Sequence, residues 1–121
     1  LLQDLDLQFV HPWTVHFQDR YYIFDFLITG NLVLECSFSQ SCPSKARVWL
    51  RSKAVLINTR FRALKIFCQP PPFTLMLLEG ACFSQNDLNS TIEPLYFTDK
   101  LVTSVDQLQE FLQKWEERRR F

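Results

Sequence analysis

The order in which residue patterns follow one another is the feature of this sequence that most limits its fold. Three short runs rich in aromatic and β-branched residues come first: 14–18, 21–28 and 32–39. Gaps of hairpin length separate them: Asp19-Arg20 and Thr29-Gly30-Asn31. A helical pattern and a largely apolar run follow: 44–65 and 73–80. We therefore predict an α/β or α+β domain whose mixed sheet starts with a three-strand β-meander and is flanked by helices.

The helical pattern is a single apolar face that neither Gly nor Pro interrupts. Its members recur at steps of three and four: Ala46, Leu50, Ala54, Ile57, Phe61 and Leu64. A second helix is predicted near the end of the chain, where Ser104 and Gln107 form a capping box. The apolar face of this last helix would be Val105, Leu108, Leu112 and Trp115. We also expect residues 1–10 to end a helix, 84–94 to be a polar loop and 95–97 to be a short strand.

Composition removes several classes of protein. The chain has 121 residues, 47% of them hydrophobic, which suits one globular domain, either complete or cut from a longer protein. With only 2 Gly and no glycine-rich phosphate motif, common nucleotide-binding folds lose their main support. The four cysteines form no CxxC pair, so we expect thiols rather than a zinc site, with disulfides left open. No apolar run approaches the roughly 20 residues of a membrane span. We expect a soluble intracellular protein, cytoplasmic or, in a eukaryote, nuclear.

The charges are unevenly distributed although the net charge is zero. Between Cys36 and Leu78 there is no Asp or Glu, and the basic residues are Lys45, Arg47, Arg51, Lys53, Arg60, Arg62 and Lys65. Solvated helix faces usually mix both signs, so this concentration favours contact with a polyanion. A solvated face remains the simpler alternative. We predict DNA, duplex or branched, as the partner.

Two acidic residues interrupt the otherwise apolar strand predictions. Side chains alternate between the faces of a strand, so Asp25 lies on the side of Ile23 and Leu27, and Glu35 on the side of Val33. A three-residue loop would pair Asp25 directly with Glu35, with Cβ atoms about 5 Å apart. Opposed like charges are destabilising, and desolvation adds to the cost. A shared proton could relieve this repulsion, and a divalent cation suits it better, because Mg²⁺ binds proteins through one or two carboxylates.

The segment FDFLITGNLVLECSFS resembles the D-x₉-E-x-K core of the PD-(D/E)XK nucleases, the superfamily of restriction endonucleases and archaeal Holliday-junction resolvases. Asp25 matches the motif aspartate and Glu35 the motif glutamate. The predicted meander, helix and strand follow the order of that family's core, over roughly residues 12–80. The resemblance implies a restriction-endonuclease-like fold, a Mg²⁺ or Mn²⁺ cofactor and cleavage of phosphodiester bonds in nucleic acid.

One position departs from the family pattern. Ser37 stands where the family has its lysine, two residues after the glutamate. Some members supply this lysine from the following helix, and the candidates here are Lys53, which we favour, and Lys45. Many members also carry an acid on a helix before the meander, a part that Asp4 or Asp6 could take.

The sequence therefore predicts a metal-dependent endonuclease that acts on DNA. Asp25 and Glu35 would hold the metal, and Lys53 or Lys45 would orient or polarise the attacking water. The residues expected to contact nucleic acid are Arg47, Arg51, Arg60 and Ser37. A homodimer, or an upstream or partner domain, could complete the protein. A non-catalytic nucleic-acid-binding or scaffold module with the same fold is the main alternative, and a small-molecule hydrolase is a weaker one. His11 and His16 are expected to be structural.

Overall fold

The computed structural model describes residues 5, 7–39, 43–80 and 95–120, with the side chains of 39, 43–50, 80 and 120 outside that description. The strands in these ranges are β1 (Phe9–Val10), β2 (Trp13–Phe17), β3 (Arg20–Phe24), β4 (Phe26–Ile28), β5 (Leu32–Ser39), β6 (Phe73–Gly80) and β7 (Lys100–Val102). The helices are α1 (Pro43–Phe67) and α3 (Val105–Arg120). The long helix, the apolar strand after it and the last helix are thus confirmed as elements.

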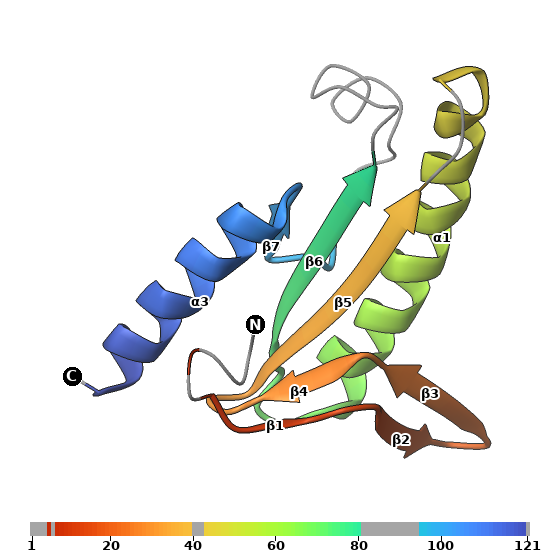
Figure 1. Cartoon of the computed structure of the whole chain (residues 1–121). Coiled ribbons are helices and arrows are strands. Elements are labelled where there is room, and N and C mark those ends of the chain that lie inside the picture. Colours follow the sequence, from red (N-terminus) through yellow and green to blue (C-terminus); the bar gives the residue numbers. More distant parts are fainter. Residues whose placement is uncertain (1–4, 6, 40–42, 81–94, 121) are drawn as a thin grey trace.

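A mixed five-stranded sheet forms the centre of the fold, in the order β1-β4-β5-β6-β7 (Figure 1). β1, β4 and β5 pair antiparallel, whereas β6 pairs parallel to β5 and β7 pairs parallel to β6. Parallel neighbours need a long crossover, and α1 makes the crossover between β5 and β6. The predicted mixed α/β class with flanking helices is therefore confirmed.

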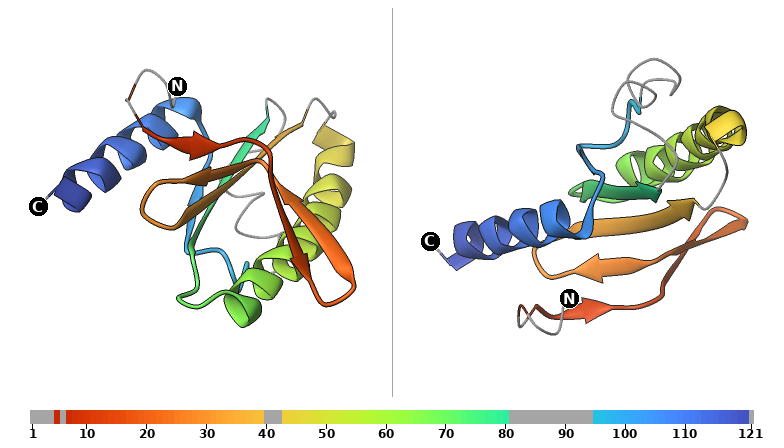
Figure 2. Two further views of the ribbon diagram at one scale, coloured as in Figure 1. Left: turned by 90° about the horizontal axis from the view of Figure 1, so that it is seen from below. Right: turned by 45° about the horizontal axis from the view of Figure 1, so that its top comes forward.

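The two helices cover opposite faces of the sheet (Figure 2). On the α1 face, Val33 and Met76 of the sheet pack with Phe61 in one buried cluster. On the α3 face, Leu34 and Leu77 pack with Leu108 and Leu112 in another cluster. β5 and β6 are thus buried on both sides, which explains their nearly continuous apolar sequence. Among the described residues, no helix combines the length and apolar composition needed to span a membrane.

The start of the predicted meander differs from the prediction. β2 and β3 form a hairpin of their own rather than the first strands of the main sheet. The predicted strand 21–28 is divided, because the chain bends at Asp25 between β3 and β4. The register explains the division: within the described strands β3 pairs with β2, from Trp13↔Phe24 onward, whereas β4 pairs with β1 and β5. The continuous aromatic pattern of 21–28 is therefore divided between two sheets, with β3 in the hairpin and β4 in the main sheet.

Two short predictions near the ends of the chain are wrong. Phe9–Val10 is a strand paired with β4 rather than helix, because its side chains alternate between burial and exposure at the sheet edge. Residues 95–97 form a turn, and the last strand is Lys100–Val102 instead. The predicted loop 84–94 lies outside the described residues. Ser104 caps α3 as predicted, since Gln107 N–H donates to Ser104 Oγ at 3.1 Å. The Gln107 side chain accepts the N–H of Thr103 at 2.9 Å, one residue before the position expected in a capping box.

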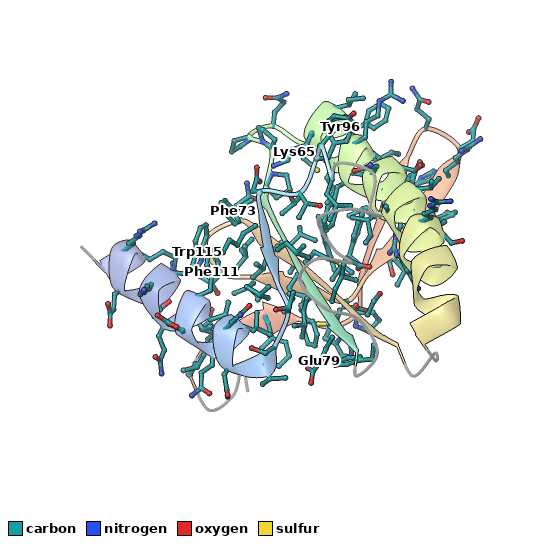
Figure 3. The ribbon with its side chains drawn as sticks, turned by 90° about the horizontal axis from the view of Figure 1, so that it is seen from above. Lys65, Phe73, Glu79, Tyr96, Phe111 and Trp115 are labelled. Carbon is teal, nitrogen blue, oxygen red and sulfur yellow. The ribbon has the colours of Figure 1, made fainter. Side chains whose placement is uncertain are left out.

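A cluster of charged and polar groups ties the end of α1 to the sheet. Lys65 Nζ, visible in Figure 3, donates to Asp99 Oδ2 at 2.6 Å and to the carbonyl of Pro72 at 2.7 Å. Thr74 N–H donates to the same Asp99 oxygen at 2.9 Å. Burial raises the pKa of Asp99, but the bonds from Lys65 and Thr74 together with the charge of Lys65 outweigh it and hold that pKa below its ordinary value. The cluster fixes β6 and β7 against the helix.

The turn between β4 and β5 sets the register of the central hairpin. Gly30 and Asn31 have φ angles of 94° and 64°, in the left-handed region that Gly and Asn tolerate best. The indole of Trp115 donates to the carbonyl of Thr29 at 3.1 Å, and its ring packs with Phe73 and Phe111 (Figure 3). The end of α3 thus holds the turn in place.

Replacing Gly30 with Ala should destabilise the protein. A Cβ at this position would lie 2.5 Å from Cδ of Arg119 and 3.0 Å from Nε1 of Trp115, at a φ that L-residues avoid. We expect a loss of about 2–4 kcal/mol in the free energy of unfolding, measured by urea titration. In an Arg119→Ala background the loss should shrink, because the nearest contact is gone. Equal stability of Gly30→Ala and the parent protein would contradict this role of the turn.

Candidate functional site

The bend at Asp25 is where the β2–β3 hairpin joins the main sheet. Phe24, the last residue of β3, is fully buried in the α1-face cluster. Phe26, the first residue of β4, packs with the α3-face cluster instead. The sequence predicts Phe24 and Phe26 on one face of a single strand, but they lie on opposite faces because the chain bends at Asp25. Asp25 itself is half-buried. This bend frees the backbone and side chain of Asp25 for contacts outside the regular ladder.

Asp25 and Glu35 lie opposite each other at the end of the β4–β5 ladder. The pairs Ile28↔Leu32, Leu27↔Val33 and Phe26↔Leu34 confirm the predicted register, and Asp25 and Glu35 are the next positions. Asp25 N–H donates to Glu35 Oε1 at 2.7 Å. In return, Cys36 N–H donates to Asp25 Oδ2 at 2.8 Å. The two carboxylates thus accept backbone hydrogen bonds from each other's strands where the ladder ends.

Glu35 is a buried carboxylate that faces α1. It is 8% exposed, and its Oε2 accepts a hydrogen bond from Arg60 Nη1 at 3.0 Å within an ion pair. Burial raises the pKa of Glu35 above its ordinary value, and the opposing charge of Arg60 offsets this only in part. The Arg60 guanidinium also lies over the ring of Phe24, with Cζ 4.9 Å from the ring centroid. Arg60 is therefore held by both a carboxylate and an aromatic face.

Lys53 is the second cation of α1 that acts on this carboxylate. Its positive charge lowers the pKa of Glu35, although less than Arg60 does. The two basic residues are seven positions apart, so they lie on one side of the helix, about 10 Å apart along its axis. Lys53 is half-buried beside the buried Ala54. Of the two lysines predicted for the site, Lys53 is thus close enough to Glu35 for its charge to act on the carboxylate. The side chain of Lys45 is outside the described residues.

On its other side, Asp25 lies near a histidine, an aromatic ring and a thiol. The carbonyl of Asp25 is hydrogen-bonded to His11 Nδ1, and the His11 ring stacks on Phe26 at 4.3 Å between centroids. Burial, followed by the charges of Asp25 and Glu35, raises the pKa of the Cys36 thiol to about 12. Cys36 is therefore a protonated thiol at neutral pH and a poor nucleophile or metal ligand. Cys68 is also a free, half-buried thiol.

For the other predicted site residues, the described part of the structure gives at most a position, and no contact with Asp25 or Glu35. Ser37 is half-buried on β5, two residues after Glu35 and so on the same face. Arg51 is exposed on α1, consistent with a surface that solvent or a ligand can reach. Arg47 and Lys45 belong to α1, but their side chains are not among those described. Asp4 and Asp6 lie outside the described residues. His16, expected to be structural, stacks on Tyr21 at 4.3 Å between ring centroids.

The chemistry of the carboxylate pair fits a hard divalent cation. Oxygen ligands from one or two carboxylates, with the remaining positions left to water and phosphate, are what Mg²⁺ uses in proteins. Each carboxylate here spends one oxygen on a backbone N–H and keeps further lone pairs, while Oε2 of Glu35 also engages Arg60. Within the described part of the chain, no group of three or more His, Cys, Asp or Glu side chains could hold a metal.

No protein-family model, no curated protein and no solved structure matches this chain.

The pairing of Arg60 with Glu35 is not indicated by the sequence. The basic segment predicts Arg60 as a phosphate contact instead. Its neighbour Phe61 is part of the apolar face, so a position beside the sheet could have been inferred from helical periodicity. The partner could not, because Glu35 lies 25 residues away and the contact depends on how α1 crosses β5.

Removing the Arg60 charge should make stability more sensitive to pH. In Arg60→Gln the buried Glu35 carboxylate loses its ion pair, so its pKa in the folded state rises further above that of the unfolded chain. A raised folded pKa stabilises the fold below the unfolded value, and this contribution is lost as the pH rises through the folded value. We therefore expect a destabilisation of about 1–3 kcal/mol near neutral pH, allowing for the partial exposure of Arg60, and a smaller one near pH 4.

Urea unfolding of Arg60→Gln at both pH values measures this effect. Arg62→Gln is the matched control, because Arg62 is an exposed cation on the same helix, two residues away. The double variant Glu35→Gln/Arg60→Gln should lose the extra pH dependence. A destabilisation that is the same at both pH values would show that the ion pair does not govern Glu35.

Proposed function

We propose that this chain is a divalent-metal-dependent nuclease domain of the PD-(D/E)XK type that cleaves phosphodiester bonds in DNA. The observation that carries the proposal is the meeting of Asp25 and Glu35 beside two cations of α1. Two carboxylates brought together in an apolar sheet cost free energy, and the bonds to Arg60 and to two backbone N–H groups offset part of that cost. The pKa of Glu35 is raised by burial, and ionisable groups with shifted pKa values often lie at functional sites.

The residues have distinct roles in the proposed reaction. Asp25 and Glu35 would bind Mg²⁺ or Mn²⁺ through carboxylate oxygens. When bound, such an ion activates a water molecule and stabilises the leaving oxygen of a phosphodiester. Lys53, from the helix rather than the strand, would orient the attacking water or hold a phosphate oxygen. Because Ser37 stands at the position of the family's lysine and cannot supply its positive charge, the helix residue Lys53 would take that role.

Arg60 adds a competing cation to this site. Its guanidinium already neutralises Oε2 of Glu35, so full use of that oxygen by a metal requires the ion pair to open. The cation–π contact with Phe24 would keep the released guanidinium near the site, where a phosphate group could take it up. Substrate and metal would therefore bind together more favourably than either alone.

The same ion pair favours one alternative. Because Arg60 supplies a positive charge beside Glu35, the carboxylate is compensated without a metal. A non-catalytic nucleic-acid-binding or scaffold module would need nothing more from this site. The two functions differ in whether Asp25 and Glu35 bind a divalent ion.

Replacing Asp25 with Asn should abolish cleavage while binding of DNA survives, because the change removes a charge and keeps the shape. Lys53→Ala should lower the rate by about 10²-fold or more with a smaller effect on affinity. Lys45→Ala, the matched control, should affect cleavage less. The assay is nicking of supercoiled plasmid and of a labelled four-way junction with Mg²⁺ and with Mn²⁺. Absence of cleavage of these, of flaps and of single strands by the parent protein would leave the non-catalytic module as the function.

The basic surface of α1 should bind DNA in a salt-dependent manner. Each phosphate contact contributes about one unit to the slope of log affinity against log salt. Replacing Arg47 and Arg51 with Ala should reduce the slope by about two, whereas Arg60→Ala should reduce it less while Glu35 holds the guanidinium. Lys114→Ala/Arg118→Ala removes two cations from α3 and is the control. If this control has the same effect as Arg47→Ala/Arg51→Ala in fluorescence anisotropy, α1 is not the contact surface.

A further inference from the structure

A pocket opens on the α3 face of the sheet, next to the proposed metal site. Its volume is about 510 Å³, and it lies between β1, the β4–β5 hairpin and the first turn of α3. Asp25 forms part of its wall, together with Cys36 of β5 and Val105 of α3. Asp25 thus belongs to both the carboxylate pair and the pocket. A volume of this size is in the range of sites that hold small organic ligands, roughly 300–1,000 Å³.

Aromatic side chains provide much of the pocket surface. Phe9 and Phe26 meet edge to face at 5.8 Å between centroids, and the His11 ring stacks on Phe26. At the rim, Phe38 is 62% exposed and Val105 is 43% exposed, although both are large apolar residues. Exposed aromatic and apolar surface around a pocket indicates a site that is covered when a ligand binds. Flat aromatic faces of this kind stack well on nucleobases.

Polar groups at one side of the pocket suit the edge of a base. The Asp25 carboxylate uses Oδ2 to accept the Cys36 N–H. Each of its oxygens has two lone pairs, so the group can accept a further N–H and also bind the proposed metal. A carboxylate accepts hydrogen bonds from the amino or imino groups of bases. An aliphatic side chain of a protein partner would instead desolvate this carboxylate without giving it a donor. The wall chemistry therefore favours a flat ligand with both a π face and N–H groups.

We propose that this pocket holds one unpaired nucleobase of the nucleic acid strand, beside the phosphodiester at the Asp25–Glu35 site. The inference rests on the proposed nuclease function and narrows its substrate class. A base stacked within an intact duplex cannot enter a pocket without being unpaired and unstacked, which costs free energy. Single strands, flaps and junctions with unpaired residues present such a base at lower cost. The preferred substrate is therefore a strand with an unpaired base next to the scissile bond.

Filling the pocket tests this proposal without relying on cleavage. Val105→Trp places an indole at the pocket rim, and Gln113→Trp, on an exposed position of the same helix outside the pocket wall, is the matched control. Binding of fluorescein-labelled 12-mers is measured by anisotropy in EDTA, for a single strand, the same strand with an internal run of abasic sites, and a duplex. Stacking of one base contributes about 1–3 kcal/mol, which corresponds to a roughly 5- to 150-fold change in affinity.

We expect the parent protein and Gln113→Trp to bind the single strand at least fivefold more tightly than the abasic strand, and Val105→Trp to lose this difference. Phe38→Ala should also reduce it, without filling the pocket. Equal affinity of the parent protein for base-bearing and abasic strands would overturn the proposal. Self-association of the parent protein that Val105→Trp abolishes would overturn it as well, by assigning the pocket to a second copy.

The same variants separate this proposal from the proposed function. Loss of base preference in Val105→Trp while no substrate is cleaved by the parent protein would support the pocket and contradict the nuclease. Cleavage of supercoiled plasmid that Asp25→Asn abolishes and Val105→Trp leaves unchanged, with no base preference in binding, would support the nuclease and contradict the pocket.

Discussion

The reciprocal hydrogen bonds between Asp25 and β5 are the constraint on which the arrangement of this protein depends. Asp25 N–H donates to Glu35, and the amide after Glu35 donates back to the Asp25 carboxylate. At this point the chain leaves the β2–β3 hairpin and enters the main sheet, so ordinary ladder bonds stop. The carboxylates of Asp25 and Glu35 accept the backbone N–H groups there instead, and these bonds fix the direction of the bend. The same contacts join Glu35, which is paired with Arg60 of α1, to Asp25, which lines the α3-face pocket.

Arg60 determines what the carboxylate pair can do. A buried Glu35 without a partner would be strongly unfavourable, and the guanidinium stabilises it in the absence of any other cation. The ion pair therefore stabilises the buried carboxylate in the fold. It also makes Arg60 compete with any metal for Glu35 Oε2. The arrangement suits a nuclease that is loaded only when a divalent ion and a phosphate arrive together, and it equally suits a module that has kept the fold without the chemistry. The nuclease and the non-catalytic module are both compatible with these contacts, and they differ in whether the two carboxylates bind a divalent ion.

Much of this fold could be predicted from local sequence patterns. The helical periodicity places α1, and the three-residue turn sets the register that opposes Asp25 and Glu35. The bend at Asp25 could not be predicted, since the aromatic alternation of 21–28 continues through it. The strand character of Phe9–Val10 was also missed, because two residues carry no periodicity and their pairing with β4 is long-range. Likewise, the Arg60 contact depends on tertiary packing rather than on any spacing in the chain.

The most direct test of the central claim is a crystal of this protein soaked in Mn²⁺ and examined for anomalous scattering. The account predicts a peak within bonding distance of carboxylate oxygens of both Asp25 and Glu35, with the guanidinium of Arg60 turned away from Glu35 Oε2. A parallel soak of Asp25→Asn should give no peak. A fully soaked crystal with the Arg60–Glu35 ion pair intact and no peak at the two carboxylates would contradict the metal site, and with it the proposed nuclease.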